Sequence, residues 1–114
     1  MLLKENRLKN KKDFEYLFRK GLRFKEDFLE LRVLRNKLKD SRFGFVVGKV
    51  VSKKATIRNK IKRRMRDIVR KKIYDIKNGL DCVVISRPTL SNKNFLEIEK
   101  TINSIFNKAG ILKK

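Results

Sequence analysis

The chain has 114 residues, a length that favours one domain, and 40% of them are apolar, including eight Phe, which is enough for a packed core. It carries 33 Lys and Arg against 12 Asp and Glu, and the resulting formal charge of +21 is tolerable in a compact fold when a polyanion supplies the counter-charge. Because there is no His and only one Cys, the sequence excludes an internal disulfide, a cysteine-based zinc site and a histidine general base.

The beginning of the chain, residues 1–9, is a short basic segment that we expect to be a mobile arm of a single domain spanning residues 1–114. It lacks the apolar stretch of a signal peptide, and no later run approaches the length of a membrane span. We therefore expect a cytoplasmic protein with no membrane partner.

The first predicted helix covers residues 11–20. Asn10 is a suitable N-cap for it, and Gly21 is a natural stop. Phe14 and Phe18 share one face of this helix, because residues four apart lie side by side. From periodicity alone, these rings could pack into the core or be presented to a ligand.

Strand-like patterns follow the first helix. Residues 22–34 alternate apolar and charged side chains, which favours a half-buried strand, and both one bent strand and two shorter ones remain open. A polar turn is predicted over residues 36–41. Residues 43–48 then read as another strand, apolar on both faces for much of its length.

The longest predicted helix runs from residue 57 to about residue 78, with Thr56 as its cap. A basic connection over residues 48–54 leads into it. The segment contains no Gly or Pro until Gly79, where the helix is expected to have ended.

The remaining elements are a short strand over residues 81–86 and a last helix that begins at Ser91 or Asn94. Cys82 lies in the apolar strand, where a buried, inert thiol is expected, so no disulfide-linked partner is predicted. The predicted order is helix, two or three strands, helix, strand, helix. Three helices and a sheet of about four strands make an α+β fold, a two-layer α/β sandwich.

The longest helix segregates its charges. Turned at 100° per residue, five cations and one amide fall in an arc of about 140°, apart from the apolar side chains. Like charges four residues apart destabilise an isolated helix, so helix stability does not explain the arc, whereas phosphate binding does. The residues of the arc are Arg58, Asn59, Lys62, Arg63, Arg66 and Arg70. Those of the apolar arc are Ile57, Ile61, Met65, Ile68 and Val69.

Several classes of basic protein share this pattern. A ribosomal protein or another RNA-binding module, a DNA-binding protein and a membrane-surface peptide all remain open from charge alone. RNA is favoured over a DNA duplex because exposed Phe rings suit unpaired bases. A membrane peptide is disfavoured because the strand-like runs need the apolar stripes of the helices to cover them.

Four motifs in order resemble the bacterial ribonuclease P protein family, over nearly the whole chain. The first is Asn6-Arg7-Leu8 with Asp13-Phe14-x-x-x-Phe18-x-x-Gly21, and the second is Phe43-Gly44-Phe45-Val46-Val47-Gly48-Lys49. The third is Arg58-Asn59-x-x-Lys62-Arg63-x-x-Arg66, and the fourth is Ser86-Arg87-Pro88. The resemblance implies an endoribonuclease subunit whose catalytic groups belong to a large RNA, which uses magnesium ions to remove the 5′ leader of precursor tRNA.

The resemblance also implies roles for individual residues. The partners would be the ribonuclease P RNA and precursor tRNA, with no catalytic or metal-binding residue on the protein. The catalytic RNA would contact Lys49, Lys54, Arg58, Asn59, Lys62, Arg63, Arg66 and Arg70. A cleft between the first helix and the sheet would receive the single-stranded leader at Phe14, Phe18, Leu31 and Arg87, with Leu31 standing where the family often has an aromatic residue. The family fold further implies a left-handed crossover between parallel strands around the basic helix, against the usual right-handed rule.

Overall fold

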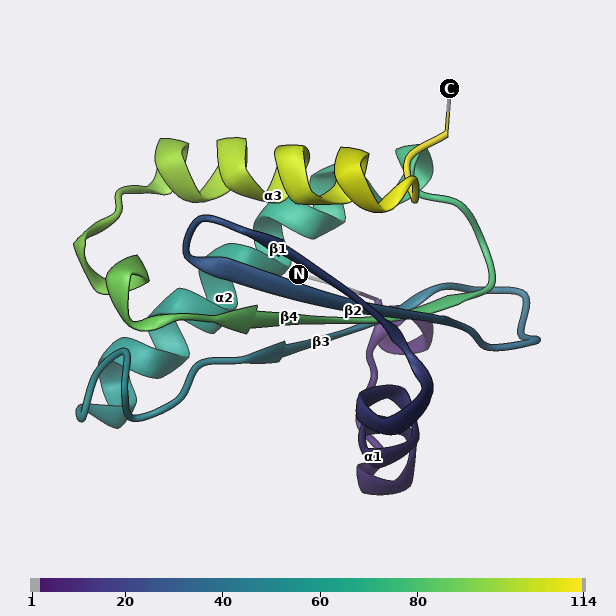
Figure 1. The fold of residues 1–114 in the computed structure, drawn as a ribbon, viewed down its shortest axis with the longest axis horizontal. Coiled ribbons are helices and arrows are strands. Elements are labelled where there is room, and N and C mark those ends of the chain that lie inside the picture. The colour runs from purple at the N-terminus through teal and green to yellow at the C-terminus, as the bar shows by residue number, and fades with distance from the viewer. Residues whose placement is uncertain (1–2, 114) are drawn as a thin grey trace.

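The sheet of the computed structural model, which describes residues 3–113, has four strands: β1 (Leu22–Glu26), β2 (Leu29–Arg35), β3 (Arg42–Val46) and β4 (Leu80–Ser86). Their order in the sheet is β1-β2-β4-β3 (Figure 1). β2 pairs with β1 and with β4 in antiparallel fashion, and β3 pairs with β4 in parallel. The mixed α+β fold predicted from the sequence is confirmed.

The alternating segment at residues 22–34 forms two strands, which settles the choice that its pattern left open. Asp27, at the turn between β1 and β2, has a φ of 49°. Asp is among the few residues apart from Gly that tolerate this left-handed conformation, so the turn can be tight. The chain then folds back and pairs Lys25 with Glu30.

The first helix, α1 (Lys11–Lys20), is confirmed at both ends. The Asn10 side chain accepts a hydrogen bond of 3.0 Å from the backbone N–H of Lys12, which satisfies one donor of the first turn. The N–H of Gly21 closes the helix by donating to the carbonyl oxygen of Leu17.

The basic helix, α2 (Ala55–Lys71), begins and ends earlier than predicted. Lys54 occupies the N-cap position without a side-chain hydrogen bond, so the prediction of Thr56 as the cap is wrong. After α2 the chain makes a short 3-10 turn, Ile73–Asp75, and Ile76 becomes buried and extended. Ile76 forms an isolated bridge with Leu112, so pairing with the end of the chain overrides the local preference for helix.

The last helix, α3 (Phe95–Ala109), starts after Asn94, whose side chain accepts a hydrogen bond of 2.9 Å from Glu97 N–H. α2 and α3 form one layer over a face of the sheet, and α1 lies on the opposite face (Figure 1). The main core lies under α2 and α3, where the rings of Phe43 and Phe106 are 5.9 Å apart. α2 lies between the parallel neighbouring strands β3 and β4 in the chain, so a crossover around the basic helix is present, and its left-handedness stays a prediction.

Residues 3–9, which belong to the segment expected to be a mobile arm, contact the domain through Asn6, Arg7 and Leu8. Arg7 forms a parallel bridge with Phe43 of the edge strand, and Leu8 is buried. The Asn6 side chain donates a hydrogen bond of 2.8 Å to the carbonyl oxygen of Ser41. This segment thus covers part of the open edge of β3, while residues 1–2 lie outside the described part of the chain.

Candidate nucleic-acid interface

The two faces of α2 separate as its sequence predicts. Its apolar side is buried in the core at Ile61, Met65, Ile68 and Val69. Ile57, which the apolar arc also contained, lies in the first turn of α2 and is 40% exposed. The polar side, which we call the basic face, comprises Arg58, Asn59, Lys62, Arg63, Arg66 and Arg70 and is exposed or half-buried throughout.

Arg58 differs from the other cations of the basic face because it organises the loop before α2. Its Nη1 donates hydrogen bonds to the carbonyl oxygens of Ser52, at 3.0 Å, and Lys53, at 2.9 Å. Lys49 and Lys54 of the same loop are exposed, so the loop adds positive charge beside the start of the helix. Arg58 therefore has a structural role as well as a charge.

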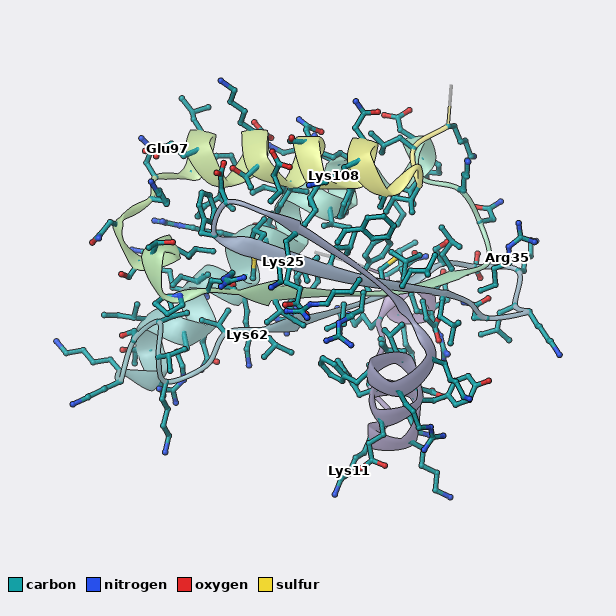
Figure 2. The ribbon with its side chains drawn as sticks, viewed as in Figure 1. Lys11, Lys25, Arg35, Lys62, Glu97 and Lys108 are labelled. Carbon is teal, nitrogen blue, oxygen red and sulfur yellow. The ribbon has the colours of Figure 1, made fainter. Side chains whose placement is uncertain are left out.

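The other four cations of the basic face have no neutralising partner among the described residues. Within residues 3–113, the side chains of Lys62, Arg63, Arg66 and Arg70 form no ion pair and no hydrogen bond. Ion pairs between other described residues lie on α1, on the sheet and at α3. Figure 2 shows Lys62 on α2, on the side away from α3. Exposed cations in this arrangement suit phosphate groups.

A second candidate surface, on the other face of the sheet, carries the two aromatic residues of α1. Phe14 is half-buried and packs against Gly44 of β3, where a side chain would collide with the ring. Phe18 is 39% exposed, with Arg32 of β2 beside it. Phe14 is thus partly structural, whereas much of the Phe18 ring is open to solvent.

The close approach at Gly44 gives a testable prediction. In Gly44→Ala a Cβ would lie 2.6 Å from Cε1 of Phe14, so either the ring or α1 must move. We expect a loss of about 1–3 kcal/mol in the free energy of unfolding, measured by denaturant titration. Pairing Gly44→Ala with Phe14→Leu should recover part of that loss, and equal losses in the single and double variants would contradict the contact.

Arg32 fixes the position of Phe18. Its guanidinium carbon lies 5.4 Å from the centroid of the Phe18 ring, and its Nη1 donates a hydrogen bond of 2.8 Å to the Phe18 carbonyl oxygen. Its Nε donates a hydrogen bond of 2.9 Å to Glu30. Arg32 therefore couples the end of α1 to the sheet and occupies one side of the aromatic ring.

The carboxylate of Glu30 is held ionised by two arginines. Burial raises the pKa of Glu30, but hydrogen bonds and charge attraction from Arg32 and Arg23 outweigh this effect and lower the pKa below its ordinary value. Because the folded-state pKa is the lower one, this carboxylate stabilises the fold above the ordinary value of about 4.5. That contribution is lost as the pH falls through the folded-state pKa.

We accordingly expect the free energy of unfolding to fall below about pH 4.5, with part of the decrease belonging to Glu30. Denaturant titrations between pH 3 and pH 7 measure it. Glu30→Gln should be less stable than the parent at neutral pH and less sensitive to acid. An unaltered acid profile in Glu30→Gln would assign the effect to other carboxylates.

The prediction that Leu31 contacts the leader is wrong. Leu31 is completely buried in the main core, on the α3 side of the sheet. Side chains alternate along a strand, so Leu29, Leu31 and Val33 share the core face and Arg32 points toward α1. The same alternation, read from the apolar positions of β2, identifies Arg32 as the missed residue.

Arg87 follows β4 and has an exposed side chain. Its backbone N–H donates a hydrogen bond of 2.8 Å to the carbonyl oxygen of Phe28, at the turn between β1 and β2. No hydrogen bond or ring contact within residues 3–113 joins Arg87 to Phe14 or Phe18. Its part in a leader site stays a prediction.

The two candidate surfaces meet at a pocket beside the edge strand β3. The lining of this pocket includes Arg7, Lys9, Phe14, Gly44 and Arg66. Arg66 comes from the basic face, and Phe14 comes from α1 on the other side of the sheet. The structure therefore brings together two residues that the sequence assigned to separate sites.

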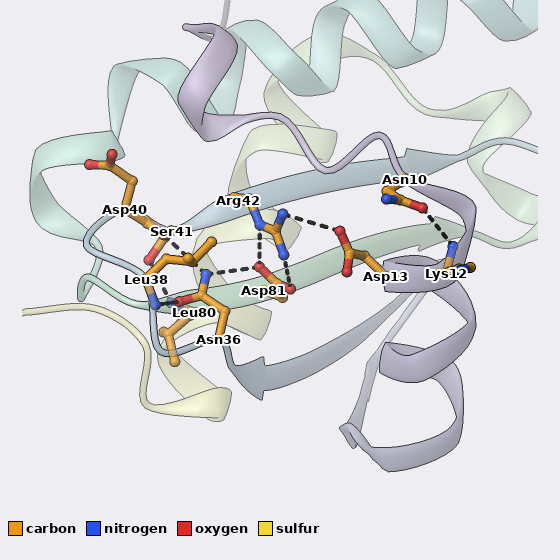
Figure 3. Close-up of polar contacts among 10 residues, drawn as sticks. All are labelled: Asn10, Lys12, Asp13, Asn36, Leu38, Asp40, Ser41, Arg42, Leu80 and Asp81. Atoms are coloured by element: carbon orange, nitrogen blue, oxygen red, sulfur yellow. Dashed lines mark hydrogen bonds and ion pairs between the residues drawn. The ribbon is translucent and has the colours of Figure 1, made fainter.

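An ion-pair network, which the sequence analysis missed, holds α1 against the sheet (Figure 3). Arg42 of β3 forms two hydrogen bonds with the carboxylate of Asp81, at 2.7 and 2.8 Å, and a third with Asp13 of α1, at 3.2 Å. The hydrogen bonds that Arg42 donates to Asp81, helped by charge attraction from both carboxylates, raise the pKa of Arg42 despite its partial burial. Asn36 donates to Asp81 at 2.9 Å and so links the β2–β3 turn to the same network.

The described residues do not suggest a metal site or a reactive thiol. Among residues 3–113 no group of three or more metal-ligating side chains is close enough to hold an ion. Cys82 is buried, and this burial raises the pKa of its thiol. No helix in this part of the chain has the length and apolar composition to cross a membrane.

Comparison with known proteins places these features in a family context. The family model described as Ribonuclease P matches residues 2–110. A ribonuclease P protein component from a Synechocystis species is 38% identical over 112 residues, covering 97% of this chain and 90% of the relative. That of Clostridium acetobutylicum is 37% identical over 112 residues, with 96% and 93% covered.

Solved structures give the same result. The ribonuclease P protein of Staphylococcus aureus matches with a TM-score of 0.88 and 26% identity, covering 95% of this chain and 98% of that one. The protein from Thermotoga maritima matches with a TM-score of 0.79 and 33% identity, covering 87% and 94%. The similarity thus extends over the sheet, the three helices and nearly the full sequence.

Proposed function

This chain belongs to the ribonuclease P protein family, and from that premise we propose that it binds the catalytic RNA of ribonuclease P through the basic face of α2. The observation that supports this proposal is the set of four cations, Lys62, Arg63, Arg66 and Arg70, that lack ion pairs within residues 3–113. A phosphate backbone would neutralise them and release its condensed counterions. Lys49, Lys54 and Asn59 lie in or beside α2 and would extend the contact.

We further propose that the leader of precursor tRNA binds at α1. Phe18 offers a ring that is held from one side by Arg32 and is open to solvent over much of its surface. Stacking on an aromatic ring is tolerant of base identity, which suits leaders of different sequence. Arg87 would contribute charge to the leader backbone, whereas Leu31 has no part in the proposal because it is buried.

Cleavage of precursor tRNA is assigned to the RNA subunit in this proposal. The described residues carry no His and no cluster of carboxylates that would fit a magnesium ion. We therefore place no magnesium site on the protein and attribute no chemical step to its side chains. The protein would act by holding two RNA molecules in a fixed relation.

Reconstitution tests the proposal. The purified chain is mixed with ribonuclease P RNA and precursor tRNA at a magnesium concentration at which the RNA alone cleaves slowly. We expect cleavage at the leader junction to be accelerated and the affinity for precursor tRNA to exceed that for mature tRNA. A general basic RNA chaperone would improve neither the rate at this low magnesium nor the discrimination between the two tRNAs, and such a result would refute the proposal.

A further inference from the structure

Tyr74 is the most exposed large apolar side chain among residues 3–113, with 86% of its surface accessible. The rings of Tyr16 and Phe18 are also exposed, but each lies against an arginine, Arg19 and Arg32 respectively. Tyr74 makes no such contact within the described residues, and its hydroxyl group has no hydrogen bond there. A ring exposed in this way buries little area in the fold and is available for stacking by a partner.

Tyr74 lies at a groove between the end of α2 and the beginning of α3, with a volume of about 640 Å³. The groove is lined by Asp67, Arg70, Lys71, Tyr74 and Phe95. The Nζ of Lys71 lies 5.7 Å from the centroid of the Phe95 ring, so its ammonium group is held at the groove. Aromatic rings beside cations are the combination that binds unpaired nucleotides, because bases stack on the rings while phosphates contact the cations.

We propose that this groove binds an unpaired nucleotide of the catalytic RNA, with its base stacked on Tyr74 and its phosphate held by Arg70 and Lys71. The inference rests on the proposed function, since it extends the same RNA contact past the end of the helix. Arg70 supports the continuity because it belongs to the basic face and also lines the groove.

The position of the groove favours the catalytic RNA over the precursor leader. α1 and its aromatic residues lie on the opposite face of the sheet from α2 and α3 (Figure 1). A leader bound at Phe18 would therefore lie on the other side of the domain from Tyr74. An RNA that follows the basic face reaches Arg70 and then the groove.

Binding of ribonuclease P RNA by Tyr74 variants tests the proposal. Tyr74→Ala should weaken affinity for the RNA about fivefold to 100-fold, with an unchanged dependence on salt, because the lost ring is uncharged. Arg70→Gln with Lys71→Gln should instead flatten the logarithmic salt dependence by about 1–2 units. Leu96→Ala, which removes a 72% exposed side chain that does not line the groove, is the control and should bind normally.

Tyr74→Trp adds a spectroscopic measurement. The parent chain has no Trp, so the fluorescence of the variant reports on position 74 alone. This variant keeps an aromatic ring at the groove, and its fluorescence should be quenched by ribonuclease P RNA and not by a leader oligonucleotide. Thermal unfolding should be unaffected in both Tyr74 variants because the ring is exposed.

Two outcomes would overturn the inference. One is parental affinity in Tyr74→Ala, and the other is unaltered Tyr74→Trp fluorescence at saturating RNA. If a variant of the basic face still lost affinity in the same assay, the proposed function would stand and the nucleotide site alone would fail. If the parent did not bind the RNA at all, the proposed function itself would fail.

Discussion

Replacing Lys62, Arg63 and Arg66 together by Gln should weaken the binding of ribonuclease P RNA about 100-fold near 0.15 M salt. Each lost phosphate contact flattens the logarithmic dependence of affinity on salt by about 0.7–0.9, so three lost contacts flatten it by about 2–3. The fold should survive because none of the three side chains forms an ion pair or hydrogen bond within residues 3–113. Binding measured at several salt concentrations gives both quantities.

The matched control for this triple variant removes the same net charge elsewhere. Lys39, Lys77 and Lys100 are exposed and lie outside α2, so their combined replacement by Gln lowers the charge equally. We expect it to reduce affinity only slightly. Similar losses in the two triple variants would show that the RNA responds to total charge and that α2 has no special role.

Phe18→Ala should lower the affinity of the reconstituted ribonucleoprotein for precursor tRNA about fivefold to 100-fold, with little effect on mature tRNA. The physical reason is the loss of one stacking surface for an unpaired base, a group that only the precursor supplies. Phe18 is the better residue for this experiment than Phe14, because Phe14 packs against Gly44 and its removal also disturbs the fold. Equilibrium binding of the two tRNAs by the same preparation provides the comparison.

Tyr16→Ala is the control for Phe18→Ala. Tyr16 is on the same helix, is 50% exposed and also lies beside an arginine, yet it has no place in the proposed leader contact. We expect its replacement to leave the affinity for both tRNAs unchanged. If Phe18→Ala weakened binding of mature and precursor tRNA equally, the aromatic surface would not be a leader site.

Local rules predicted the features of this fold that depend on neighbours in the sequence. Asn10 and Gly21 bound α1 because capping and termination are decided within one helical turn. The separation of apolar and basic side chains on α2 follows from helical geometry and is present as predicted. The identity of the basic face therefore needed no tertiary information.

Features that depend on distant contacts were the ones the sequence could not supply. α2 stops at Lys71 although the next residues could continue a helix, because Ile76 pairs with Leu112 near the other end of the chain. The packing of residues 3–9 on β3 depends on a partner more than 30 positions away. The network around Arg42 joins three separate elements, and no spacing along the chain identifies it.

Leu31 illustrates a different failure. Its role was taken from a family position, while the alternation of its own strand places the side chain in the core. An aligned position carries over the backbone location, but the local packing decides whether a side chain is accessible. Arg32, one residue along, is the neighbour that faces α1.

The pocket shared by Phe14 and Arg66 has a mechanical consequence. Phe14 belongs to α1, which the ion pair between Asp13 and Arg42 holds to the sheet. Arg66 belongs to α2, which packs on the opposite face of the sheet. If the two RNAs bind as proposed, the sheet between these helices would set the distance between the leader contact and the contact with the catalytic RNA. The position of the leader would then depend on that distance and not on the identity of its bases.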